Sequence, residues 1–319
     1  MNEKILVTGA TGFVGSALVQ RLSSCPNIQT VAVVRQKRVN LPAGVSASVV
    51  TDKWNVSELS FTDVKSVVHC AARVHVMNDC SDSSLALYRE VNVNLTLDLA
   101  RNAAKAGVKR FIFLSSIKVN GESTSPGCPF FADDVSAPID PYGISKMEAE
   151  QGLRHISEEL GIEVVIIRPV LIYGPGVKAN FRSMINWLDK GVPLPFGAMR
   201  NKRSLVSLDN LVDLIVTCLD HPNAANQTFL VSDGEDVSTS ELLYRMGKAM
   251  EKPVRLISVP PVVLNACAFI LGRTDISRRL NGSLQVDIQK TRELLGWCPI
   301  QSLDNGLKKV ARSLLLGSD

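Results

Sequence analysis

The residues with the clearest chemical potential are a tyrosine and a lysine four positions apart. Tyr142 and Lys146 follow Asp140-Pro141, which is typical of a helix start, because Asp caps helices and Pro suits the first helical position. Residues four apart share one helix face, so the phenol and the ammonium group are expected to lie side by side. A free phenol has a pKa near ~10, and a neighbouring ammonium lowers it toward a range useful for acid–base catalysis. The same spacing also fits an exposed turn of an amphipathic helix.

A serine supplies a third candidate group. Ser116 follows the run 110–114, whose residues Arg-Phe-Ile-Phe-Leu predict a strand. Ligands of parallel α/β sheets bind outside the carboxyl ends of the strands, which is where this serine is expected to stand. Its hydroxyl can there hydrogen-bond a substrate oxygen beside the phenol of Tyr142. Ser116, Tyr142 and Lys146 therefore form one candidate catalytic constellation.

A glycine-rich turn precedes these residues in the chain. Residues 8–15 read Thr-Gly-Ala-Thr-Gly-Phe-Val-Gly, between a strand predicted at 4–8 and a helix predicted at 12–22. Glycines at such a junction allow a sharp turn, close approach of the backbone to a diphosphate and tight helix packing. The helix N-terminus adds N–H groups and a positive dipole end. The pattern predicts a dinucleotide site around Gly9, Thr11, Gly12, Phe13, Val14 and Gly15.

The residue after the second predicted strand bears on which dinucleotide binds. An acidic residue there would bind the adenosine ribose diol and favour NAD. This chain has Arg35 after the strand at 31–34, and a guanidinium suits a 2′-phosphate through charge-assisted bonds. We therefore expect NADP, with NAD as the alternative, because an arginine can also stack on adenine or belong to a solvated basic loop.

Short β-branched runs alternate with longer helical patterns over the first half of the chain. The predicted strands cover 4–8, 31–34, 48–50, 66–70, 110–114 and 164–167. Helical patterns lie at 12–22, 84–106 and 142–160. This order predicts an α/β fold of the Rossmann type, with a doubly wound parallel sheet covered on both faces.

The pattern loosens after residue 168, where prolines punctuate a loop-rich stretch. A strand–helix–strand pattern appears again at 204–231, and further helical patterns lie at 181–188, 241–250, 287–295 and 303–315. We expect a dinucleotide-binding domain over 1–168 and a smaller, interleaved substrate-binding lobe over 169–319. Strands from about 204–231 are expected to return to the main sheet.

Composition and charge narrow the class of protein. The 319 residues carry 35 basic and 31 acidic side chains, a net charge of +4, and the basic residues are scattered. Nucleic-acid binders usually concentrate basic residues, so an anionic small molecule is the expected partner and nucleic acid is not. Seven cysteines without a Cys-x-x-Cys pair argue against a disulfide framework and a metal site, and favour a reducing compartment.

The chain shows no targeting or membrane-spanning signal. A short strand-like run follows the first four residues directly, without a signal peptide, so we expect a cytoplasmic protein. The longest uncharged stretch, 256–272, contains Pro260 and Pro261 and is shorter than the ~20 apolar residues of a membrane span. We expect it to form a buried turn and helix, with contact to a membrane surface as the alternative.

As a set, these motifs resemble the extended short-chain dehydrogenase/reductase family, which contains nucleotide-sugar epimerases, dehydratases and reductases. The resemblance covers nearly the whole chain. The matching segments are Thr8–Gly15, His69–Ala72, Val91–Asn94, Ser115–Gly121, Tyr142–Lys146, Arg168-Pro169, Tyr173–Gly176, 201–205 and 209–211. The resemblance implies that the cofactor is bound by Asp52 at the adenine, by Cys70, Ala71, Ala72 and Asn92, and by Pro169 beside the nicotinamide.

The resemblance also implies roles for the catalytic constellation. Tyr142 would act as general acid and base at a sugar hydroxyl or ketone, Lys146 would lower its pKa and hold the nicotinamide ribose, and Ser116 would orient the reacting oxygen. The implied substrate is a UDP-sugar, and a homodimer through the helices at 84–106 and 142–160 is expected. The candidate substrate-binding residues are Ser116, Asn180, Arg203, Arg278 and Arg279.

Departures from the family pattern bear on the reaction. Dehydratases of the family carry an Asp-Glu pair after the catalytic serine or threonine, and this chain has Ile117-Lys118 there, which disfavours dehydration. The runs 115–122 and 178–181 resemble reductases, and Leu171 stands where several 4-epimerases carry Asn. The main expectation is NADPH-dependent C4 reduction of a UDP-4-keto-6-deoxy-N-acetylhexosamine for surface polysaccharide biosynthesis. The alternative is a UDP-hexose or UDP-N-acetylhexosamine 4-epimerase with bound NAD. A non-catalytic NADP-sensing regulator is more distant, because Tyr142 and Lys146 are both present.

Overall fold

The computed structural model describes residues 3–36, 39–50, 56–74, 82–125, 127–177, 179–270 and 281–316. Three predicted site residues, Asp52, Arg278 and Arg279, lie outside the described residues. Asn180 is described only as part of the backbone of helix α5 (Ala179–Asp189).

The chain builds its main sheet from seven parallel strands in the order β3-β2-β1-β4-β5-β6-β9. This order is that of a doubly wound Rossmann fold with one further strand, so the predicted fold class is confirmed. The strands are β1 (Glu3–Thr8), β2 (Ile28–Val34), β3 (Ser46–Val49), β4 (Val64–His69), β5 (Arg110–Leu114), β6 (Glu163–Pro169) and β9 (Thr228–Val231).

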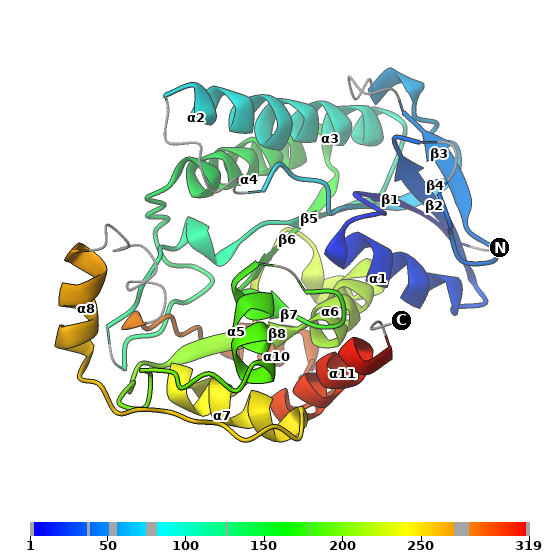
Figure 1. Cartoon of the computed structure of the whole chain (residues 1–319). Coiled ribbons are helices and arrows are strands. Elements are labelled where there is room, and N and C mark those ends of the chain that lie inside the picture. Colours follow the sequence, from blue (N-terminus) through cyan, green and yellow to red (C-terminus); the bar gives the residue numbers. More distant parts are fainter. Residues whose placement is uncertain are drawn as a thin grey trace.

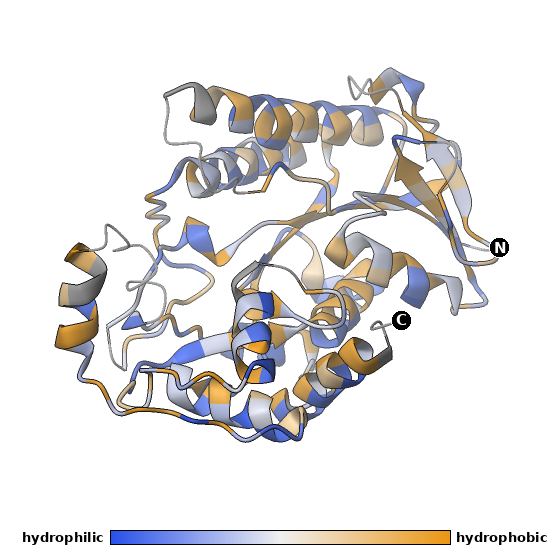
Figure 2. Cartoon of the chain, in the orientation of Figure 1, coloured by the Kyte–Doolittle hydropathy of each residue, from blue (hydrophilic) through white to orange (hydrophobic). Residues whose placement is uncertain are grey.

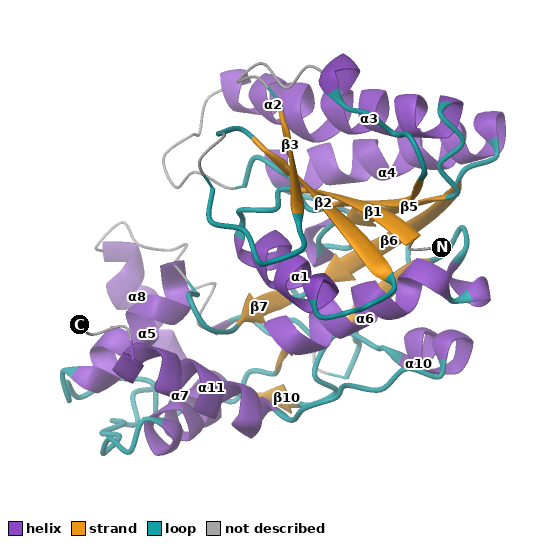
Figure 3. Ribbon diagram, turned by 90° about the vertical axis from the view of Figure 1, so that its right-hand side faces the viewer, coloured by secondary structure: helices purple, strands orange, loops and turns teal. Residues whose placement is uncertain are grey.

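Two layers of helices cover the sheet (Figures 1 and 3). Helices α1 (Phe13–Ser23) and α6 (Leu208–Asp220) lie on one face, and α3 (Leu95–Lys105) and α4 (Pro141–Leu160) on the other. Successive strand residues alternate between the two cores: Ile112 packs with the α1/α6 layer, while Phe111 and Phe113 pack with the α3/α4 layer. Burial of both faces explains why these strands read as continuous apolar runs.

The long helix predicted at 84–106 is divided in the structure. It consists of α2 (Asp82–Tyr88), a π-helical turn η2 (Arg89–Asn94) and α3. A π-helical turn inserts extra backbone into a helix and often occurs at functional sites. Here it carries Asn92, and hydropathy periodicity alone does not reveal it.

A smaller unit packs beneath the main sheet around a three-stranded sheet of β7 (Leu171–Tyr173), β8 (Arg203–Ser207) and β10 (Asp236–Val237) (Figure 1). Its own apolar core contains Tyr173 stacked on Phe181, with ring centroids 5.4 Å apart. The predicted boundary at residue 168 stays a prediction. The remaining elements are η1 (Val56–Glu58), η3 (Ile117–Val119), α5, η4 (Pro222–Ala224), α7 (Thr239–Ala249), α8 (Pro261–Ile270), α10 (Gln289–Leu295) and α11 (Leu303–Leu316).

Helix α8 contradicts the prediction of a buried segment. It stands at the edge of the molecule, and Figure 2 shows its apolar residues in orange there. Phe269 and Ile270 are 76% and 80% exposed, because the long connection from α7 carries the helix away from the cores. Within the described ranges, no helix is both long and apolar enough to cross a membrane.

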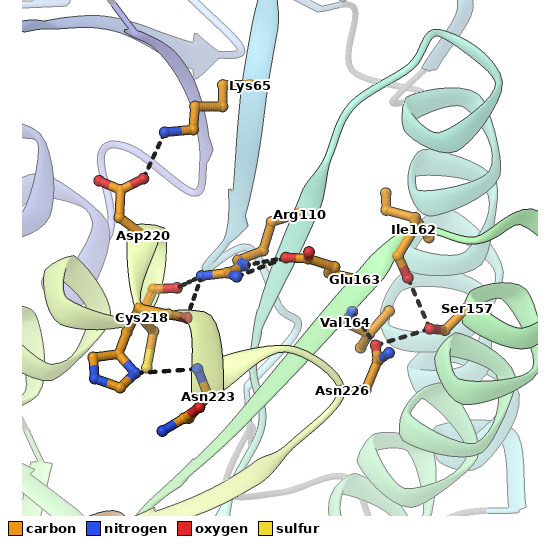
Figure 4. Close-up of polar contacts among 11 residues, drawn as sticks. Lys65, Arg110, Ser157, Ile162, Glu163, Val164, Cys218, Asp220, Asn223 and Asn226 are labelled. Atoms are coloured by element: carbon orange, nitrogen blue, oxygen red, sulfur yellow. Dashed lines mark hydrogen bonds and ion pairs between the residues drawn. The ribbon is translucent and has the colours of Figure 1, made fainter. Parts of the chain in front are cut away.

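The amino-terminal end of the sheet is tied together by Arg110 (Figure 4). Its Nη1 donates to the carbonyl oxygens of Cys218 and His221, at 2.6 and 3.0 Å, at the C-terminus of α6. Its Nε donates to Glu163 at 2.8 Å. Charge-assisted bonds to the last carbonyls of a helix stabilise that end, so this pair joins β5, β6 and α6.

Candidate active site

The glycine turn lies at the carboxyl end of β1, as predicted. Gly9 has φ of +65°, and a Cβ on it would stand 2.7 Å from the backbone nitrogen of Ala71. A Cβ on Gly15 would stand 2.1 Å from the carbonyl oxygen of Gly9. Gly12 precedes α1 and has no side chain with which to cap it, while Thr11 and Gly12 are exposed. A helix N-terminus beside a turn that only glycine can form fits a dinucleotide diphosphate.

The segment after β4 lies directly against this turn. His69 is buried, with Nδ1 2.7 Å from Thr8 Oγ1 and Nε2 3.0 Å from Thr96 Oγ1. Burial and the nearby charge of Lys146 lower the pKa of His69 to about 3, so the ring is neutral and joins β1, β4 and α3. Burial raises the pKa of the Cys70 thiol to about 12, so the thiol is also uncharged at neutral pH.

Asn92 fixes the next part of that segment. Its amide donates to the carbonyl oxygen of Arg73 at 3.1 Å and to Ser145 Oγ at 3.0 Å, and its oxygen accepts from the backbone N–H of Arg73 at 2.8 Å. Asn92 therefore clamps the chain after β4 to helix α4. Its predicted contact with the cofactor stays a prediction.

Ser116 and Tyr142 meet at the carboxyl end of β5. Ser116 caps η3, and its hydroxyl accepts from the backbone N–H of Lys118 at 3.3 Å. Burial and the Asp140 carboxylate raise the pKa of Tyr142, while the nearby Ser116 side chain opposes this rise. The structure thus brings two of the three predicted catalytic groups near one another.

Lys146 lies on the same helix face but its ammonium is engaged elsewhere. Nζ donates to the carbonyl oxygen of Leu114 at 2.9 Å, and it lies 4.4 Å from the ring centroid of Phe113 and 6.0 Å from that of Tyr142. Burial lowers the pKa of Lys146 to about 8, and the nearby Cys70 and Glu150 oppose this. The predicted lowering of the Tyr142 pKa by Lys146 stays a prediction.

The start of α4 agrees with the predicted cap. Asp140 Oδ1 accepts from the backbone N–H of Gly143 at 2.6 Å, and Pro141 occupies the first helical turn. The other carboxylate oxygen of Asp140 pairs with Lys118 Nζ. Lys118, which stands where dehydratases carry an acidic residue, thus fastens the serine-bearing turn to the start of α4.

Two charged residues near this centre were not predicted to act. Glu150 lies one helical turn beyond Lys146, and Arg168 precedes Pro169 at the end of β6; both are buried and form a bidentate ion pair. The four-residue spacing from Lys146 to Glu150 could have indicated the first of them. Their pairing joins α4 to β6, which no local pattern shows.

The other predicted residues lie on separate elements. Arg35 is exposed just after β2, and Pro169 ends β6. Arg203 lies on β8 of the smaller sheet, where its Nη1 donates to the carbonyl oxygen of Gly282 at 3.4 Å and burial lowers the pKa of its guanidinium. In the described part of the chain, no group of three or more His, Cys, Asp or Glu is arranged to hold a metal ion.

Comparison with known proteins places this site in a family. Residues 5–232 match the model of the NAD dependent epimerase/dehydratase family. The chain belongs to this family. It is 51% identical to a UDP-glucose 4-epimerase of Vibrio cholerae, over 99% of this chain and 96% of that one.

Solved structures of this family share the fold. A Thermotoga maritima UDP-glucose 4-epimerase solved with UDP-glucose superposes with a TM-score of 0.79 at 22% identity, over 99% of this chain and all of that one. A Bacillus cereus UDP-glucuronic acid 4-epimerase in complex with UDP-glucuronic acid and NAD gives 0.78 at 22% identity, over 98% and 99% of the two chains.

The expectation of a UDP-4-keto-sugar reductase is wrong. Identity of 51% along the whole chain to a 4-epimerase outweighs the short runs on which the reductase reading depended. Arg35 was predicted to bear on the choice of dinucleotide, and that prediction does not concern the reaction at the sugar. Leu171 is 42% exposed on β7, and one such position does not decide the chemistry.

Proposed function

We propose that the protein is a UDP-sugar 4-epimerase that interconverts the C4 configuration of a UDP-hexose or UDP-N-acetylhexosamine with a bound NAD. The observation that carries this proposal is the identity to the Vibrio cholerae UDP-glucose 4-epimerase over nearly the full length of both chains. The proximity of Tyr142 and Ser116 at the carboxyl end of β5 supports it, because 4-epimerisation needs a proton acceptor at the sugar 4-hydroxyl.

The chain's own residues would divide the work at the sugar. The Tyr142 phenol would take the proton of the 4-hydroxyl and give one back, and Ser116 would hold that oxygen in place. Tyr142 must lose its proton to act as base, although Asp140 and burial raise its pKa, so the charge of Lys146 has to lie close to it during turnover. A bound nicotinamide would supply the acceptor and donor for the hydrogen on C4.

The glycine turn is the part of the chain that would hold the cofactor diphosphate. Gly9, Gly12 and Gly15 let the turn pack closely against its own backbone and against the segment after β4, at the N-terminus of α1. We propose NAD rather than NADP, because the matching family is NAD dependent and the superposed Bacillus cereus epimerase contains NAD. The predicted NADP preference of Arg35 is decided by identifying the dinucleotide released from the purified protein by acid.

The remaining parts of the proposal concern substrate, assembly and location. Arg203 and Asn180 would contact the UDP-sugar. We also propose a homodimer formed through α3 and α4, and a cytoplasmic reaction. Size-exclusion chromatography with light scattering tests the dimer directly.

An isotope-free assay tests the function. Purified protein is incubated with UDP-glucose, and separately with UDP-N-acetylglucosamine, without added cofactor, and the C4 epimers are separated by chromatography. The proposal predicts that one or both substrates approach equilibrium with their epimer. Tyr142→Phe should abolish the conversion, whereas Tyr244→Phe, on a 62% exposed side chain of α7, should not. Absence of any C4 epimer, with or without added NAD, would refute the proposal.

A further inference from the structure

A buried ion pair lies directly behind the candidate active site. Glu150 of α4 and Arg168 of β6 are only 2% and 3% exposed. Arg168 Nε donates to Glu150 Oε1 at 2.9 Å, and Nη2 donates to Oε2 at 2.5 Å. Bidentate pairing of this kind fixes both distance and orientation. The pair therefore sets how the catalytic helix sits against the end of β6.

The same pair holds both ends of the segment that carries Ser116. At one end, the Ser115 hydroxyl donates to Glu150 Oε1 at 2.5 Å. At the other end, Arg168 Nη1 donates to Asn120 Oδ1 at 2.9 Å, and the Asn120 amide donates to the carbonyl oxygen of Phe131 at 2.8 Å. Ser116 thus lies in a short turn between two points fastened to one rigid pair.

The pair also acts on the charge of Lys146. Glu150 follows Lys146 by one helical turn, and its carboxylate raises the pKa of Lys146 against the lowering caused by burial. The other titratable groups that affect Lys146 or are affected by it are Cys70 after β4 and His69 of β4, and both are uncharged at neutral pH. Tyr142 lies on the same face of α4. Glu150 is therefore the anion that favours the ammonium form.

Burial of an ion pair is costly, and well-packed apolar residues of similar size are often as stable or more so. Stability alone does not account for the arrangement. Two of its further hydrogen bonds involve Ser115 and Asn120, which flank the candidate catalytic serine, and a longer one goes to the carbonyl oxygen of Ala132.

We propose that Glu150 and Arg168 are positioning residues of the active site, which hold Ser116 against Tyr142 and keep Lys146 charged. This inference rests on the proposed epimerase function. It assigns no contact of either residue with the substrate, and it places their effect in kcat and its pH dependence rather than in KM.

A matched pair of variants tests the proposal. Glu150→Gln removes the charge but keeps an oxygen for Ser115, whereas Glu163→Gln makes the same change in the Arg110 pair at the opposite end of β6 (Figure 4). For UDP-glucose, or for UDP-N-acetylglucosamine if only that sugar is turned over, Glu150→Gln should lower kcat about tenfold to a hundredfold, with KM nearly unchanged, because small misplacements of catalytic groups have large effects. The alkaline limb of its kcat profile should move to lower pH, since Lys146 loses its anion. Glu163→Gln should leave kcat and the pH profile as in the wild type.

The possible outcomes distinguish failure of the positioning role from failure of the proposed epimerase function. A folded Glu150→Gln protein with wild-type kcat and pH profile would overturn the positioning role, as would an equal loss in Glu163→Gln. If Glu150→Gln does not fold, Ser115→Ala removes only one hydrogen bond and should still lower kcat severalfold; unchanged kcat would overturn the proposal. If the wild type epimerises neither sugar, the proposed function fails. Hydrogen exchange of the backbone amides in segment 115–121 then tests the positioning role by itself. Faster exchange in Glu150→Gln or Ser115→Ala supports that role, and unchanged exchange overturns it.

Discussion

Replacement of Gly9 by alanine tests whether the glycine turn must approach the segment after β4 as closely as the structure shows. The residue has φ of +65°, and an alanine Cβ would stand 2.7 Å from the backbone nitrogen of Ala71. The nitrogen of Ala71 is a backbone atom of the segment directly after β4, so it cannot move away as the end of a flexible side chain could. The change should therefore combine a conformational cost with a steric one.

The magnitude follows from these two costs. A left-handed conformation costs a non-glycine residue about 1–2 kcal/mol. Overpacking at a rigid site costs about 1–3 kcal/mol more. Gly107→Ala is the matched control, because Gly107 has φ of +83° and a Cβ on it would meet nothing within 4 Å. Gly9→Ala should lower the free energy of unfolding by about 2–5 kcal/mol, and Gly107→Ala by only about 1–2 kcal/mol.

Thermal unfolding followed by circular dichroism, together with the dinucleotide content after purification, measures the difference. Gly9→Ala should unfold at a lower temperature than Gly107→Ala and should retain less dinucleotide, since the turn would be displaced from the segment after β4. Equal destabilisation by the two substitutions would refute the steric argument. Full retention of dinucleotide by a folded Gly9→Ala protein would refute the assignment of the turn as the cofactor cradle.

Three further predictions concern titration and buried hydrogen bonds. Asp140→Asn should lower the pKa of Tyr142, because the Asp140 carboxylate raises that pKa, and Asn can still cap α4. Ultraviolet titration of tyrosinate should show the shift, and an unchanged titration would contradict the prediction. The pKa of His69 is lowered to about 3, so the unfolded chain binds an extra proton below its ordinary value of 6.5. As the pH falls from 6.5 to about 3, the free energy of unfolding should therefore decrease by about 1.4 kcal/mol per pH unit. Urea denaturation at several pH values measures this decrease, and an equally steep decrease in a His69→Gln variant would contradict the prediction. Tyr173→Phe removes a 2.6 Å hydrogen bond to buried Asp233 and should lower the free energy of unfolding by about 1–3 kcal/mol in urea denaturation; no loss would contradict the assigned bond.

Much of the fold was predictable because it depends on local patterns. The apolar run at 110–114 becomes β5 without change, and the predicted helix at 142–160 becomes α4 with Asp140 as its cap. In both cases the signal lies within a few residues of the chain. The continuous helix predicted at 84–106 was wrong, because a π-helical turn interrupts it. That turn carries Asn92, whose side chain is hydrogen-bonded to a residue far away in the sequence, so the signal is not local.

The reaction was less predictable than the fold. Ser116, Tyr142 and Lys146 are a set that reductases and epimerases of the family share, so their presence leaves the net reaction open. Short runs near the site favoured a reductase, and identity along the whole chain to a 4-epimerase corrected this. Apart from Ser116, the predicted substrate-binding residues lie in the second half of the chain, and their binding role stays a prediction.

Short stretches of sequence predict most strands of the main sheet, the glycine turn and the spacing of Tyr142 and Lys146, because these follow from backbone geometry and periodicity over short distances. Long-range packing sets the remaining features: the Lys146 ammonium turns to the Leu114 carbonyl, Glu150 pairs with Arg168, and α8 is exposed. Those features join residues far apart in the chain. The pKa values of the buried groups depend on burial and on charges brought near by folding. The residue types of the candidate site can therefore be predicted from short stretches of sequence, whereas its electrostatics and rigidity arise from long-range packing.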